Sequence, residues 1–272
     1  MKIKNIILIA VSFVAIIVTL IFVTLINKAV GNILGKQIGN LSQILAIPII
    51  YYTVKLILNK SENTEKINSI LPINKFAISQ FLKYYSIGLM LSILTSFITF
   101  VVGKTMQFEI YFQNNLTYKI YISFIIMLCV GFMEELFFRG LIQQLLYNYF
   151  NSKLYPAIIS AILFGLIHTQ IFNDNNGFIY FIDIIVFGFF ASLLFLKTKS
   201  LIPPIALHAA WNFADEFFLD YESKTIVYNS KILSQVQYLE LGSTYISIAI
   251  FLILSIYLFK NLKNNNQFSK FN

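Results

Sequence analysis

The chain has 272 residues, of which 58% are hydrophobic and only 12% are charged, against roughly 25% charged residues in an average soluble domain. This composition excludes an ordinary soluble domain and predicts an all-α, polytopic membrane protein. The net charge of +8 could indicate nucleic-acid binding, but the lysines are scattered through short loops, where they can set the orientation of the chain in a membrane.

Eight apolar stretches follow one another along the chain, each long enough to cross ~30 Å of hydrocarbon as a helix. They cover residues 6–26, 41–58, 84–102, 120–146, 154–172, 178–196, 201–219 and 244–259. The first is longer than the core of a secretory signal and no clear cleavage site follows it, so we expect a retained helix. No internal repeat is evident, which argues against the inverted-repeat transporter folds.

The positively charged residues predict how these stretches are oriented. If the N-terminus lies in the cytoplasm and all eight stretches cross the membrane, the cytoplasmic segments hold 14 of the 20 lysines and arginines and the outer segments hold six. Positive residues concentrate in cytoplasmic loops. We therefore expect a multi-pass protein of the cell membrane with both termini in the cytoplasm.

The fourth stretch carries two adjacent carboxylates in GFMEELFFRG, residues 131–140. A charge near the centre of a bilayer costs about 2.5–3.5 kcal/mol even on lenient insertion scales. Glu135 and Arg139 are four residues apart with the acid first, the favourable arrangement for an ion pair on a helix. Glu134 points about 100° away and stays available as a general base. The same residues could instead form a packing ion pair beside a glutamate in a water-filled cavity.

Both histidines of the chain also lie in apolar stretches. His168 ends the segment FGLIH, in which Phe164 lies one turn earlier and can support the imidazole ring. His208 and Asn212 share a helix face in PPIALHAAWN, whose prolines fit a first helical turn and whose alanines permit a close neighbouring helix. Either histidine can bind a metal or a water, and Asn212 can donate to an oxyanion. A lone intramembrane histidine could equally bond to a neighbouring helix.

Three further chemistries that use histidine, aspartate or cysteine within a membrane do not fit these residues. A zincin needs His-Glu-x-x-His, whereas Thr-Gln follows His168. An aspartyl protease needs two intramembrane aspartates; Asp183 has no Gly-x-Gly-Asp partner, and we expect it to serve in packing or in a cavity. Cys129 is the only cysteine, which excludes an internal disulfide and a cysteine-based zinc cluster, and it lies about 140° around the helix from Glu134.

Three motifs, Glu-Glu-x-x-x-Arg, Phe-x-x-x-His and His-x-x-x-Asn, therefore follow in order on three apolar helices. This ordered set resembles the CPBP family, which comprises type II CAAX prenyl endopeptidases and the related bacterial bacteriocin-processing and abortive-infection (Abi) proteins. The resemblance covers about residues 120–215, roughly a third of the chain, with all three motifs intact. It implies an eight-helix intramembrane metalloprotease.

The resemblance divides the chain into three parts. Residues 1–119 hold helices one to three without a recognised signature, residues 120–219 hold a CAAX-protease-like catalytic core of helices four to seven, and residues 220–272 hold an outer loop, the last helix and a cytoplasmic tail. The implied catalytic residues are Glu134, Glu135, Arg139, His168, His208 and Asn212.

The resemblance also implies a role for each of these residues. Glu134 and His168 would activate the attacking water, while His208 and Asn212 would stabilise the oxyanion. Glu135 would hold the arginine of its motif and shape the site. Glu134, His168 and His208 would suffice as ligands of a catalytic zinc with an open position, but a metal-free glutamate mechanism uses the same residues.

The expected partners are membrane lipids and a peptide or lipidated-peptide substrate, with no nucleic acid and no oligomeric state determined. Prenylated CAAX proteins are chiefly eukaryotic, so in a bacterium the resemblance implies a peptide, pheromone or bacteriocin precursor as substrate. The alternative is a non-catalytic membrane protein that confers bacteriocin self-immunity or binds a peptide. A proton-coupled carrier would also use intramembrane Glu and His, but the sequence shows no internal repeat of the kind that many carrier folds contain.

One geometric difficulty follows from these positions. At about 1.5 Å per residue, Glu134 and His208 fall about 10 Å from the inner membrane face, whereas His168 falls about 21 Å from it. Errors in the predicted boundaries, together with a fifth helix that starts late or tilts strongly, would bring the three residues to one level.

Overall fold

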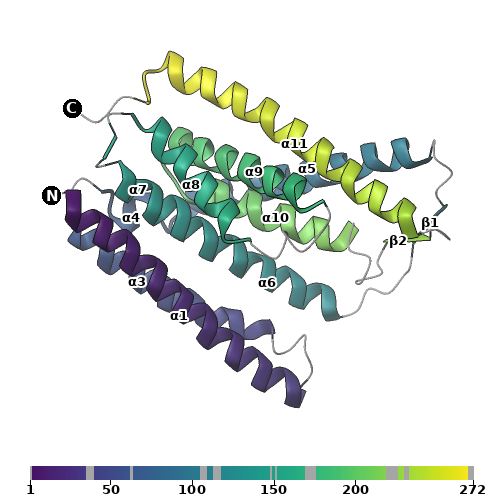
Figure 1. Cartoon of the computed structure of the whole chain (residues 1–272), viewed down its shortest axis with the longest axis horizontal. Coiled ribbons are helices and arrows are strands. Elements are labelled where there is room, and N and C mark those ends of the chain that lie inside the picture. The colour runs from purple at the N-terminus through teal and green to yellow at the C-terminus, as the bar shows by residue number, and fades with distance from the viewer. Residues whose placement is uncertain are drawn as a thin grey trace.

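The computed structural model describes residues 2–34, 40–61, 64–104, 109–112, 118–147, 149–150, 152–168, 176–218, 226–229 and 233–268. These residues form a bundle of long helices (Figure 1). The all-α, polytopic membrane class predicted from the composition is confirmed.

The helices take up all eight predicted stretches. They are α1 (Lys2–Leu34), η1 (Leu41–Leu45) leading into α3 (Ala46–Lys60), α4 (Ile67–Ile70), α5 (Lys75–Lys104), α6 (Tyr118–Glu135), η2 (Leu136–Ile142), α7 (Gln143–Leu146), α8 (Leu154–Leu166), α9 (Gly177–Thr198), α10 (Ile202–Phe218) and α11 (Leu233–Asn264). Helix α6 continues without a break through η2, a π-helical segment, into α7.

Six of these helical segments are long and apolar enough to cross a membrane, within the described part of the chain. They cover Ile7–Leu34, Leu41–Lys60, Lys75–Thr99, Ile120–Leu146, Gly177–Thr198 and Leu241–Asn264. The other two predicted stretches form the shorter helices α8, of 13 residues, and α10, of 17 residues. At about 1.5 Å per residue, α8 is only ~20 Å long and does not cross the hydrocarbon alone.

The fifth stretch was predicted to be helical to residue 172, but α8 ends at Leu166; residues 169–172 lie outside the described residues. The side chain of His168 explains the early end. Its Nδ1 lies 2.8 Å from the Phe164 carbonyl oxygen, which a backbone N–H would take up in a continuing helix. The backbone N–H of His168 turns to the Gly165 carbonyl instead, at 3.1 Å.

A short antiparallel ribbon was not predicted from the sequence. Strand β1 (Glu109–Phe112) pairs with β2 (Ile226–Asn229), Glu109 opposite Asn229. Both strands are rich in the β-branched and aromatic residues that favour strands. The ribbon joins two connections that lie far apart in the sequence.

Helix α10 is enclosed by α5, α6 and α9, while α1 and α3 lie side by side at one edge of the bundle (Figure 1). Glycines allow the closest approaches. A Cβ added at Gly88 of α5 would lie 2.7 Å from the Leu207 carbonyl oxygen, and one added at Gly131 of α6 would lie 3.0 Å from the Ala209 nitrogen. Such small-residue contacts bring helix backbones together in membranes, and here they fix α10 beside α6.

Candidate active site

The predicted ion pair of α6 is present and fully buried. The Arg139 guanidinium donates from Nη1 to Glu135 Oε1 at 2.9 Å, and both side chains are 0% exposed. Its Nη2 donates to the Gly188 carbonyl oxygen of α9 at 2.8 Å, and its Cζ lies 4.7 Å from the centre of the Phe164 ring. The cation therefore faces a carboxylate, a carbonyl and an aromatic ring, while Arg139 Nε and Glu135 Oε2 are buried without a hydrogen-bond partner among the described residues.

The same Glu135 oxygen fixes His208. Nδ1 of His208 lies 2.8 Å from Glu135 Oε1, and because an ionised carboxylate only accepts, Nδ1 carries the hydrogen. The Phe187 ring packs against this imidazole with ring centres 4.8 Å apart. In the neutral ring the free lone pair is therefore on Nε2, which faces away from Glu135.

His168 is oriented in a similar way by Phe164, as the sequence predicted. The two rings pack with centres 4.9 Å apart, and Nδ1 of His168 donates to the Phe164 carbonyl oxygen at 2.8 Å. A carbonyl oxygen only accepts, so Nδ1 again carries the hydrogen and Nε2 carries the lone pair.

Glu134 lies between the two Nε2 atoms. Its Oε1 is 4.0 Å from Nε2 of His168, and its Oε2 is 3.7 Å from Nε2 of His208. The Glu134 side chain is 24% exposed, unlike the buried Glu135. These separations are too long for direct hydrogen bonds, but they leave room for a water oxygen that bonds to more than one of the three groups.

The structure thus brings five of the six predicted residues into contact: Glu134, Glu135, Arg139, His168 and His208. Asn212 lies one turn beyond His208 on α10, half-buried, and makes none of these contacts. It shares the His208 face of the helix, so it lies at the border of the cluster.

The depth difference calculated for His168 is wrong, because its Nε2 lies within 4.0 Å of Glu134. Helix α8 starts where it was predicted to start, so a late start is not the reason. The helix that carries Glu134 continues to the end of α7. Helix α10 begins further inside the bundle than that end, because Leu201, just before α10, lies next to Gly140. Because the helix ends do not lie in one plane, depth cannot be counted from them.

Asp183 and Cys129 take no part in the contacts of this cluster given above. Asp183 on α9 accepts a hydrogen bond from Ser247 of α11 at 2.7 Å, so it has the packing role that was predicted for it. Cys129 is a buried free thiol in the apolar core.

The sequence analysis missed the polar groups of α9 that support the site. Besides the Gly188 carbonyl, the Ser192 carbonyl accepts from Gln143 Nε2 at 3.5 Å, and Gln143 Nε2 also donates to the Tyr147 hydroxyl at 3.1 Å. A signal for Gln143 and Tyr147 was present. They continue the four-residue spacing of Glu135 and Arg139 along one helix face.

The residues match a zinc ion in chemistry but not in spacing. Two imidazole nitrogens and one carboxylate are a ligand set found in catalytic zinc sites. In such sites each ligating histidine also donates its other N–H to an acceptor, as both histidines do here. Tetrahedral ligands at about 2.0–2.1 Å lie roughly 3.4 Å apart, whereas these atoms are 3.7 and 4.0 Å apart. Among the described residues, no group of three His, Cys, Asp or Glu is placed to hold a metal ion.

Comparison with known proteins identifies the segment that carries this cluster. Residues 115–214 match the family model described as Rce1-like, type II CAAX prenyl endopeptidase Rce1-like. The match contains all six predicted site residues and confirms the resemblance drawn from the three motifs. No curated protein and no solved structure gave a significant match.

Proposed function

We propose that this chain is an intramembrane endopeptidase of the CAAX type, which hydrolyses a peptide bond with a water activated by Glu134 and His168. One observation carries the proposal: both histidines direct Nε2 toward Glu134, at 4.0 and 3.7 Å, while their Nδ1–H groups are held by fixed acceptors. The family match at residues 115–214 supports the same reaction class.

In the proposed reaction the water oxygen attacks the carbonyl carbon of the substrate while Glu134 takes the proton. Glu134 then delivers that proton to the leaving amine as the C–N bond breaks. His168 orients the water through Nε2. His208, when both of its ring nitrogens are protonated, and the Asn212 amide donate to the oxyanion of the tetrahedral intermediate. No step requires a metal ion.

The proposed substrates are membrane-associated peptides, either lipidated or leader-bearing, such as a pheromone or bacteriocin precursor in a bacterium. The proposed reaction acts on the peptide bond itself, so it does not require a particular substrate side chain next to that bond. Partial exposure of Glu134 and His168, 24% and 22%, supports access of a peptide to the two groups that would handle the water.

The test is cleavage of a quenched fluorescent peptide library by detergent-purified protein. Glu134→Ala should lower cleavage at least ~100-fold, since general acid–base catalysis contributes about 10²–10⁴-fold. Cys129→Ser, which changes a buried thiol outside the cluster, should keep the wild-type rate. Cleavage by Glu134→Ala at the wild-type rate would remove Glu134 from the base role.

A chelator arm distinguishes the two water-activation mechanisms. Cleavage that withstands a zinc chelator supports the glutamate–histidine mechanism, and cleavage that is lost with chelator and restored by zinc supports a metal mechanism. A wild-type protein that binds peptides from the library but cleaves none would favour the self-immunity or peptide-binding alternative.

A further inference from the structure

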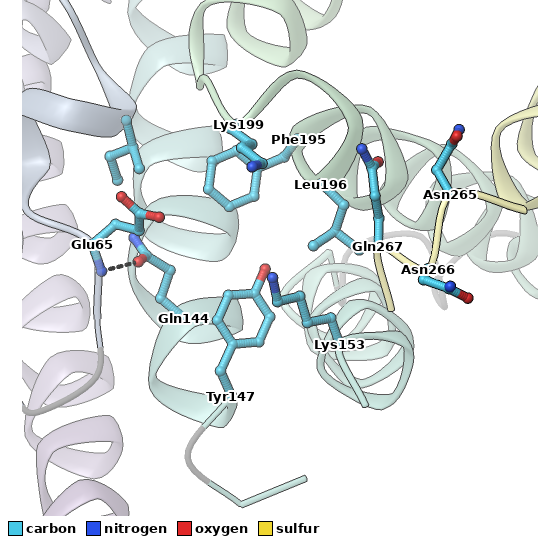
Figure 2. A pocket seen from close by; sticks show the side chains of 11 residues that line it. Glu65, Gln144, Tyr147, Lys153, Phe195, Leu196, Lys199, Asn265, Asn266 and Gln267 are labelled. Atoms are coloured by element: carbon cyan, nitrogen blue, oxygen red, sulfur yellow. Dashed lines mark hydrogen bonds between the residues drawn. The ribbon is translucent and has the colours of Figure 1, made fainter. Parts of the chain in front are cut away.

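A pocket lies where several helices of the bundle end, and none of its lining residues belongs to the Glu134 cluster; Figure 2 shows it from close by. It is formed where α7 ends, α8 begins, α9 ends and the turn after α11 folds back. Tyr147, in its wall, lies ~20 Å along the helix from Glu134. The cavity measures about 250 Å³, below the roughly 300–1,000 Å³ typical of drug-sized ligands. It therefore suits a small chemical group.

Two lysines share this pocket with one carboxylate. Figure 2 shows Lys153 and Lys199 around the same space as Tyr147, with Glu65 at its far side. Burial, followed by the charge of Lys199, lowers the pKa of the half-buried Lys153 ammonium, and Glu65 opposes this shift. The described lining thus places two cationic side chains around one space with a single carboxylate at its far side, a charge distribution that suits an anion.

The backbone of the pocket is strained at two of its lining residues. Lys199 has φ 53° and Asn266 has φ 52°, and in the described part of the chain these are the non-glycine residues with positive φ. The left-handed conformation costs an L-residue roughly 1–2 kcal/mol, and glycine is the usual residue directly after a helix. Lys199 directly follows α9 in this conformation, and its side chain borders the pocket.

The ends of the candidate membrane spans give the pocket an expected depth near the lipid head groups. Three candidate membrane spans end beside it, at Leu146, Thr198 and Asn264. Its lining combines apolar side chains, including Phe195 and Leu196, with charged and amide groups. Such a boundary between apolar and polar lining matches the phosphate region of a bilayer.

One lining acceptor is unsatisfied. Gln267 Oε1 is buried and makes no hydrogen bond within the described residues, although its side chain borders the cavity. Buried oxygens of this kind normally have a partner. A ligand that carries a hydroxyl as well as an anion would supply one.

We propose that this pocket binds the phosphate of an anionic phospholipid head group, with Lys153 and Lys199 as its cations and with Glu65 and Gln267 as acceptors for head-group hydroxyls. The proposal goes beyond the proposed proteolysis and does not depend on it. A zwitterionic choline head group is a poorer match, because it adds a positive charge beside two lysines and offers no hydroxyl.

The experiment measures lipid binding to the detergent-purified full chain by native mass spectrometry, with phosphatidylglycerol and phosphatidylcholine as probes. The double variant Lys153→Gln/Lys199→Gln should bind phosphatidylglycerol at least tenfold more weakly than the wild type. The matched control is Lys260→Gln/Lys263→Gln, which removes the same charge from exposed positions at the end of α11 outside the pocket. It should change the affinity less than twofold.

A second variant separates binding from folding. Lys199→Gly relieves the positive φ, so it should unfold at the same or a higher temperature than the wild type while binding phosphatidylglycerol several-fold more weakly. Three results overturn the proposal: equal loss of lipid in the pocket and control variants, equal binding of phosphatidylcholine, or competition by millimolar inorganic phosphate as effective as that by lipid. The last result would assign the pocket to a soluble phosphate.

Discussion

At the scale of single residues, neighbouring glutamates have opposite environments. Glu135 is fully buried, and its Oε1 accepts from both Arg139 and His208. Glu134, one residue earlier, is 24% exposed and lies 3.7 Å or more from both histidine Nε2 atoms. The difference arises because adjacent helix positions point about 100° apart. Glu135 is thereby suited to positioning other side chains, and Glu134 to proton transfer.

We predict that Glu135→Gln lowers the free energy of unfolding by about 3 kcal/mol, because removing one partner leaves a buried guanidinium unpaired. Chemical denaturation in detergent measures this change. Glu134→Gln is the control, and it should stay within about 1 kcal/mol of the wild type, the range of a partly exposed charge. Equal stability of the two variants would contradict the assigned positioning role of Glu135.

Phe164 contacts three members of the cluster. Its ring packs against the guanidinium of Arg139 and against both imidazoles. We predict that Phe164→Leu lowers the rate of peptide cleavage about tenfold, since small misplacements of catalytic groups are costly. Phe190→Leu is a matched control, because Phe190 is similarly buried but packs on Phe251 of α11. Equal cleavage rates for the two variants would show that Phe164 acts only in packing.

At the scale of elements, the site depends on irregular and short helices. The π-helical η2 begins directly after Glu135 and contains Arg139, and π-helical turns are frequent at functional sites. His168 lies two residues beyond the end of α8, which has 13 residues, and His208 lies in α10, which has 17. Helix α9 packs against α8, and α5 and α6 pack against α10; His208 is buried, while His168 stays 22% exposed.

The close approach of α6 to α10 gives an element-scale prediction. A Cβ at Gly131 would lie 3.0–3.2 Å from the backbone and Cβ of Ala209, the residue after His208. We predict that Gly131→Ala separates the helices, lowers cleavage about tenfold or more and costs about 1–3 kcal/mol of stability by overpacking. In Gly242→Ala of α11 the new methyl meets nothing within 4 Å. This control should leave cleavage unchanged.

At the scale of the whole molecule, a charged cluster lies inside the bundle, and apolar side chains cover its outer surface. Arg139 is among the largest fully buried side chains, while many large apolar side chains, such as Leu25 at 62% and Phe97 at 60%, are exposed as lipid contacts would require. The orientation of this bundle stays a prediction, drawn from the distribution of lysines and arginines.

That orientation can be tested with single cysteines in a Cys129→Ser background. Lys28 near the end of α1 and Lys60 at the end of α3 are both exposed. In sealed cells an impermeant thiol reagent should label Lys28→Cys and leave Lys60→Cys unlabelled, because the N-terminus is predicted to be cytoplasmic. Labelling of Lys60→Cys alone would reverse the topology.

Features that depend on local physics could be predicted from the sequence. Eight apolar stretches predicted eight helices, because hydrocarbon requires a self-satisfied backbone. The spacing of Glu135 and Arg139 predicted their ion pair, because residues four apart on a helix are neighbours. The support of His168 by Phe164 followed in the same way, and the order of the three motifs predicted the resemblance that the family model at residues 115–214 supports.

How these parts meet became known from the packing of the helices. The convergence of both histidine Nε2 atoms on Glu134 and the role of the Gly188 carbonyl depend on the relative depth of α8, α9 and α10. The lysine pocket likewise joins the ends of helices far apart in the chain. The spacing of residues along one helix does not show how deep that helix lies relative to its neighbours. Close packing between helices sets this depth, as it does where α10 meets Gly131.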